Sequence, residues 1–124
     1  MILDAGVLIS IDRSEQAART FLTAAERTGT PLHTTHPVLE QAWRDGARLV
    51  RLAAFTKTLA IHALDDGPAV GKLLGLARSS DVGDAHLVLL ALRLGDDVLT
   101  GDPVDLEALA ATLGPAAPTI HHWP

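Results

Sequence analysis

The sequence predicts an α/β fold, a three-layer α/β/α sandwich with a central, mostly parallel sheet of four to five strands. Short apolar runs alternate with longer segments of helical periodicity, and acidic residues stand at or near the ends of several short runs. The chain has 124 residues, 48% of them hydrophobic and 20% charged, which suits one globular domain over residues 1–124. No repeat, linker or low-complexity tract divides it.

The chain is expected to begin with a strand at residues 1–3 and a helix over residues 15–27. Ser14 is a suitable N-cap for this helix because its hydroxyl can accept a backbone N–H, and Gly29 suits its end. Apolar residues recur at helical spacing between these two positions.

A second strand is expected at residues 31–35, followed by a helix over 37–44. Proline is favoured in the first turn of a helix, which Pro37 would occupy, and Asp45-Gly46 predicts a stop. A further helix is expected over residues 47–55.

Residues 59–62 are expected to form a third strand. The helices that follow are expected over 66–78, with Asp66 as cap, and from about 81 to 94, where Gly95 closes the second one.

The remaining elements are a strand at 98–100, a helix over 104–113 and an edge strand at 119–122. Gly114-Pro115 suits the end of that helix, because proline cannot continue it.

The bulk composition narrows the class of protein. The net charge is −5, so contact with nucleic acid requires a local basic patch. The chain has no cysteine, which excludes disulfides and thiolate metal sites. No signal peptide is apparent, and the longest apolar run is too short to cross a membrane. We therefore expect a cytoplasmic protein without a membrane partner.

Four carboxylates, Asp4, Glu40, Asp84 and Asp102, stand where apolar runs give way to loops or helices. The carboxyl ends of parallel strands lie along one edge of a sheet, so these acids can meet there. Together and without cations they would repel one another strongly. A hard divalent ion such as Mg²⁺, which prefers oxygen ligands, would relieve that repulsion. The four acids thus predict a metal site for phosphoryl-transfer or nuclease chemistry.

Each acid also has a simpler structural interpretation. Asp4 would suit the N-cap of a helix over residues 5–11. Glu40, in the first turns of its helix, would be favoured there by the helix dipole and solvated. Asp81 is the better N-cap beside Asp84, with Ser80 as its competitor, whereas Asp84 interrupts a buried stripe and needs a partner. Asp102 fits a turn before Pro103.

Four short stretches resemble the PIN domain and, within it, the VapC-like toxins of bacterial type II toxin–antitoxin systems. They are Ile2-Leu3-Asp4-Ala5-Gly6-Val7-Leu8-Ile9, Val38-Leu39-Glu40, Asp84-Ala85-His86-Leu87-Val88 and Val98-Leu99-Thr100-Gly101-Asp102. Their order and spacing extend over nearly the whole chain. The sequence departs from the family after the first acid, where many members carry Ser, Thr or Asn and this chain has Ala5 and Gly6.

The resemblance implies a PIN-like fold and a metal-dependent endoribonuclease that uses Mg²⁺ or Mn²⁺. It implies that Asp4, Glu40, Asp84 and Asp102 bind the metal, with Asp81 and Asp105 as accessory acids and Thr100 as a supporting hydroxyl. It also implies a VapB-like antitoxin partner, an RNA substrate and a homodimer. Apolar residues around Leu73-Leu74 and from Leu49 to Phe55 exceed what one small core needs, and we expect the dimer and antitoxin surfaces there.

Arg44, Arg48 and Arg51 are candidates for RNA contact, because their spacing would align them if one helix continued through Gly46. A solvated basic face, or contact with an acidic partner, is the alternative. The chain has only two Trp, two Phe and no Tyr, so recognition of RNA would depend on backbone charge and shape. The histidines are assigned to no metal site.

Two other functions are compatible with the pattern. A non-catalytic PIN-like module would bind a partner or RNA without cutting, and the missing hydroxyl after Asp4 favours it. An unrelated phosphotransfer domain ranks last. Asp4-Ala5-Gly6 lacks the second Asp of a haloacid-type phosphatase, and no Lys follows Lys72 to serve as in a receiver domain.

Overall fold

Five short strands, all parallel, form one central sheet in the order β3-β2-β1-β4-β5. The computed structural model describes residues 1–124. The strand bounds are β1 Ile2–Leu3, β2 His33–Thr35, β3 Ala60–His62, β4 Val98–Thr100 and β5 Ile120–His122. The expected class of fold, the parallel sheet and all five strands are confirmed.

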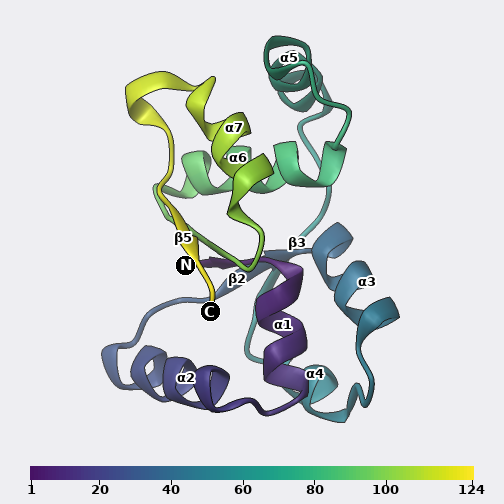
Figure 1. Ribbon diagram of the computed structural model, residues 1–124, viewed down its shortest axis with the longest axis vertical. Helices are drawn as coiled ribbons and strands as arrows, with labels where there is room; N and C mark the ends of the chain where they lie inside the picture. The colour runs from purple at the N-terminus through teal and green to yellow at the C-terminus, as the bar shows by residue number, and fades with distance from the viewer.

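Helices cover both faces of the sheet (Figure 1). Their bounds are α1 Ala5–Asp12, α2 Gln16–Thr28, α3 His36–Asp45, α4 Val50–Phe55, α5 Gly67–Ala77, α6 Val82–Leu94 and α7 Pro103–Ala111, with a short 3₁₀ turn at Gly114–Ala116. Helices α1 to α4 lie on one face and α5 to α7 on the other. None of these helices is long and apolar enough to cross a membrane.

The strand order reverses direction at β1. The chain moves from β1 outward through β2 to β3, then returns past β1 to β4 and β5. The change of direction explains why the first four helices and the last three lie on opposite faces. In open α/β sheets the crevice at such a reversal, beyond the carboxyl ends of the two central strands, is where ligands bind. Here those strands are β1 and β4.

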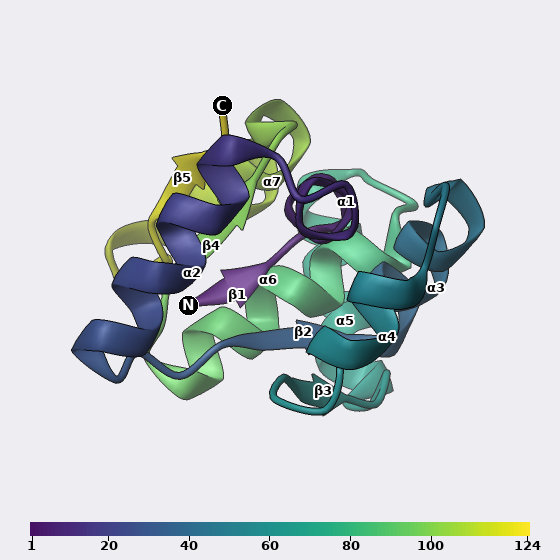
Figure 2. The same cartoon turned by 90° about the horizontal axis from the view of Figure 1, so that it is seen from below.

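The core forms on both faces of β1 and β4. The residues of both strands are buried, because the apolar side chains of α1 and α6 pack against them. Helix α1 is seen end-on beside the sheet in Figure 2. Because α6 ends at Leu94, just before β4 begins, it runs antiparallel to the strands and presents its first turn at their carboxyl edge.

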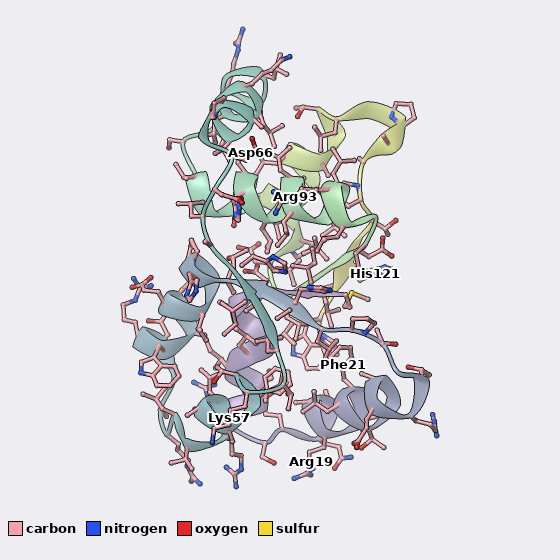
Figure 3. All side chains as sticks on the ribbon, turned by 180° about the vertical axis from the view of Figure 1, so that it is seen from behind. Arg19, Phe21, Lys57, Asp66, Arg93 and His121 are labelled. Carbon is pink, nitrogen blue, oxygen red and sulfur yellow. The ribbon has the colours of Figure 1, made fainter.

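The C-terminal strand is held by an aromatic contact. The Trp123 ring is buried and lies edge-on to Phe21 of α2, with ring centroids 5.6 Å apart. Its indole N–H donates to the Ser10 hydroxyl at 3.0 Å. Figure 3 shows Phe21 on the inner side of α2, whereas Arg19 and Lys57 point outward.

Two local expectations were wrong. Ser14 does not cap α2; it has a φ of +53° and the N-cap is Glu15. The helix expected from residue 47 begins only at Val50. Because α3 ends at Asp45, at the predicted stop, Arg44, Arg48 and Arg51 do not share a helix face.

A buried carboxylate explains this break. Asp12 accepts the backbone N–H groups of Arg48 at 3.2 Å and Leu52 at 3.3 Å, so it fixes the segment between α3 and α4. Burial alone would raise the pKa of Asp12. The backbone N–H groups of Leu49, Arg48 and Leu52 outweigh the effect of burial, so the pKa of Asp12 is lowered. A Cβ on Gly46 would stand 2.8 Å from the Ala42 carbonyl oxygen, so this turn requires glycine.

The expected apolar surplus is mostly ordinary core. Leu52 and Leu73 are buried, and Leu49, Leu74 and Phe55 pack against the core. Among the apolar residues of these stretches, Val50 and Ala54 are exposed, Val50 with 77% of its surface.

Candidate metal centre

Five aspartates from three segments of the chain line one cavity at the carboxyl edge of the sheet. The cavity has a volume of ≈ 410 Å³, and its acids are Asp4, Asp81, Asp84, Asp102 and Asp105. They lie at the reversal of strand order, because β1 ends at Leu3 and β4 ends at Thr100. Chain topology therefore gathers acids that are up to about 100 residues apart in the sequence.

Asp4 is the most firmly oriented of these acids. It is the N-cap of α1, and its Oδ1 accepts the Ala5 backbone N–H at 2.9 Å. Its Oδ2 accepts the Thr100 hydroxyl at 2.7 Å. Asp4 is therefore both the N-cap of α1 and a member of the acidic cluster.

Thr100 links the ends of β1 and β4. Its side chain is fully buried, donates to Asp4, and accepts the Asp102 backbone N–H at 3.0 Å. One hydroxyl therefore fixes the carboxylate of the first acid and the backbone of the last. Asp102 itself makes no side-chain capping bond to α7 and is exposed at the cavity.

Asp81 and Asp84 enter the cavity from the first turn of α6. Asp81 is the N-cap, as expected, and accepts the Asp84 backbone N–H at 2.9 Å. Burial raises the pKa of Asp84 to about 7, and the negative charges of Asp81, Asp4 and Asp105 contribute to the rise. The predicted repulsion between clustered carboxylates therefore adds to the effect of burial on Asp84.

Glu40 lies at the rim of this cluster. It lines an adjoining cavity of ≈ 210 Å³ together with Asp4, Asp81 and Asp84. Its side chain is 68% exposed, and its Oε1 is 4.0 Å from Nη1 of Arg44, which lines the same cavity. Arg48 and Arg51 line neither cavity.

Gln41 is a polar residue that the sequence pattern did not single out. It lines both cavities, beside the acids of β1 and α6. Nothing in its sequence position distinguishes it from any exposed residue of an amphipathic helix, so only the packing of α3 against α1 reveals it.

The donor set fits a hard divalent cation, because it consists of carboxylate oxygens with no thiolate or imidazole. The raised pKa of Asp84 marks a negative cluster that a cation would relieve. As the side chains stand, however, no three Asp, Glu or His residues are arranged to hold one ion. Metal binding would therefore require the carboxylates to turn toward a common point.

A larger cavity, of ≈ 540 Å³, lies between α2 and the end of α4. Its lining is mainly apolar or neutral and includes a single acid, Glu26. It offers no comparable cluster of ligands, so the edge of the sheet is the better candidate for chemistry.

Comparison with known proteins supports the fold. No protein-family model matches the sequence, and no curated protein matches it. A chain of the VapBC2 complex from Rickettsia felis, solved bound to a DNA fragment from their promoter, has a similar structure, with a TM-score of 0.71. The match covers 99% of this chain and 98% of that chain at 12% sequence identity. This likeness extends over the whole architecture and concerns the fold alone.

Proposed function

We propose that this protein is a metal-dependent endoribonuclease, the toxin component of a VapBC-type toxin–antitoxin system. The observation that carries the proposal is the convergence of Asp4, Asp84 and Asp102 at the reversal of strand order. The likeness in fold to a chain of a VapBC2 complex supports it. The four motifs that resemble VapC-like toxins supply these same acids.

Asp4, Asp84 and Asp102 would hold Mg²⁺ or Mn²⁺, with Glu40 completing the site from α3 and with Asp81 and Asp105 as accessory acids. A bound divalent ion would polarise the scissile phosphate and lower the pKa of an attacking water. Thr100 would keep Asp4 turned toward the cavity, because its hydroxyl bond leaves that carboxylate little rotational freedom. Either Glu40, exposed at the smaller cavity, or Asp102, exposed at the larger acidic cavity, would take a proton from water.

RNA would bind to the surface around the acids through its sugar–phosphate backbone. Arg44 lines the Glu40 cavity and could pair with a phosphate next to the metal site. Arg48 and Arg51 are exposed on the adjoining segment and on α4, where they could continue this contact. The net charge of −5 makes such a local path necessary.

A VapB-like antitoxin is the partner that this function requires. We also propose a homodimer. A mass by light scattering that stays monomeric at micromolar concentration would contradict the dimer without affecting the proposed nuclease site.

One observation favours a second candidate, a PIN-like module that binds RNA or protein without cutting. Ala5 and Gly6 place no hydroxyl or amide beside Asp4, and no three acids are yet arranged around one ion. Retained RNA binding without metal binding would select this function.

The proposal is tested by incubating the purified protein with total RNA in Mn²⁺ or Mg²⁺. Cleavage that EDTA abolishes, and that is lost in Asp4→Asn but kept in the surface variant Glu107→Gln, is the expected result. Both variants remove one negative charge, so the comparison separates the site from bulk charge. Equal cleavage by Asp4→Asn would refute the assignment.

A further inference from the structure

Two histidines meet on neighbouring strands, outside the acidic cluster. His33 begins β2 and His62 ends β3, and the register pairs His33 with Ala60 and Thr35 with His62. Since paired residues of parallel strands point to the same face, both imidazoles lie on one side of the sheet. Nδ1 of His33 is 3.0 Å from Nε2 of His62, with ring centroids 5.2 Å apart and planes tilted by 35°.

This separation suits two ligands of one transition-metal ion. Zinc–imidazole bonds measure about 2.0–2.1 Å, so two nitrogens on one ion are about 2.9 Å apart at right angles and about 3.4 Å apart in a tetrahedron. The observed 3.0 Å falls within this interval. In the metal-free state the two nitrogens share one proton in a hydrogen bond. An ion bound to both would displace that proton and lie to one side of the line that joins the two nitrogens.

The surroundings favour the neutral form of His33. Both side chains are partly buried, and burial, followed by the charge of His62, lowers the pKa of His33. Asp96 acts on His33 in the opposite direction and supplies a negative charge near the pair. Neutral imidazole is the form that binds metals, so protons compete weakly for His33 at neutral pH.

We propose that His33 and His62 form a second metal site, which binds one borderline transition ion of the Zn²⁺ class with water completing its coordination. Its imidazole ligands differ from the carboxylates of the acidic cluster, so the two sites prefer different metals. The ion would join β3, a three-residue edge strand, to β2, from which α3 and Glu40 follow directly. An ion that binds the folded state and not the unfolded state would raise the stability of the folded protein.

The test uses Zn²⁺ for affinity and thermal shift, and Cu²⁺ for electron paramagnetic resonance, with the full-length protein. Variants His33→Gln and His62→Gln remove one ligand each, and His122→Gln, on the opposite edge strand, is the matched control. We expect one equivalent of Cu²⁺ to show coupling to two imidazole nitrogens. We expect Zn²⁺ to raise the melting temperature of the wild type and of His122→Gln.

Zinc affinity should fall by at least about ten-fold in either ligand variant. Unchanged affinity in both, or Cu²⁺ signals without coupling to two imidazole nitrogens, would overturn the proposal. If a ligand variant does not fold, Zn²⁺-induced shifts of the His33 and His62 ring resonances in the wild type decide the question. If Zn²⁺ shifted the ring resonances of His121 or His122 in place of those of His33 and His62, the proposed site would be refuted.

Discussion

The substitution Thr100→Val isolates the hydroxyl that connects the two central strands. Valine has nearly the same shape and suits a strand, so the change removes two hydrogen bonds without altering the packing. The bond to the Asp4 carboxylate contributes about 1.5–3 kcal/mol, and the bond from the Asp102 N–H contributes up to about 1 kcal/mol. We expect a loss of about 3 kcal/mol in the free energy of unfolding.

The control is Thr34→Val on β2. Thr34 is also fully buried, but its hydroxyl donates to the neutral Leu3 carbonyl oxygen at 2.8 Å. That bond contributes about 1 kcal/mol. With a urea m-value of about 1.5 kcal/mol/M, the unfolding midpoint should fall by about 2 M for Thr100→Val and by less than about 1 M for Thr34→Val.

The two variants should differ more clearly in metal binding. Groups that orient a metal ligand change metal affinity by about 10- to 100-fold, so Thr100→Val should weaken Mn²⁺ binding in a calorimetric titration by that factor. Thr34→Val does not touch a proposed ligand and should bind as the wild type does. If Thr100→Val lost stability but kept its Mn²⁺ affinity within two-fold, our account of Asp4 orientation would be wrong.

Three further predictions concern stability, each measured by urea unfolding. Burial and neighbouring carboxylates raise the pKa of Asp84 to about 7, so in EDTA the contribution of Asp84 to stability should fall as the pH rises from about 4 to about 7; the same slope of stability against pH in the wild type and in Asp84→Asn would contradict this. Asp12→Ala should cost about 3 kcal/mol, because buried N–H groups, including that of Leu52, lose their acceptor, while Mn²⁺ affinity stays the same. Asp12→Asn should cost less, and equal losses would refute the capping role. Trp123→Ala should cost about 3–5 kcal/mol through lost packing; a loss below about 1 kcal/mol would show that β5 is not anchored there.

The sequence pattern predicted the elements and most of the acidic cluster because both follow from local rules. Asp4 and Asp102 could be recognised because each follows a short apolar strand, and Asp84 because it interrupts a buried stripe. The reversal of strand order then brings these positions together. Bringing these positions together requires only the order of the strands in the sheet.

Contacts between distant segments could not be predicted in this way. The end of α3 at Asp45 was predicted, but the path of the chain from there to Arg48 was not, because Asp12, 36 residues before Arg48, fixes that segment. The meeting of His33 with His62 depends on the register between β2 and β3, which neither strand's own residues specify. Gln41 was missed because its role comes only from tertiary packing.

The most direct test of the central claim is a calorimetric titration of Mn²⁺ into the wild type, Asp84→Asn and Glu107→Gln at pH 7.5. Asp84 lies among the clustered acids, whereas Glu107 is an exposed acid on α7 that lines neither acidic cavity. We predict saturable binding to the wild type and to Glu107→Gln, and a loss of at least about ten-fold in affinity for Asp84→Asn. Equal affinities for all three proteins, or no saturable binding to the wild type, would contradict a metal centre at this edge of the sheet.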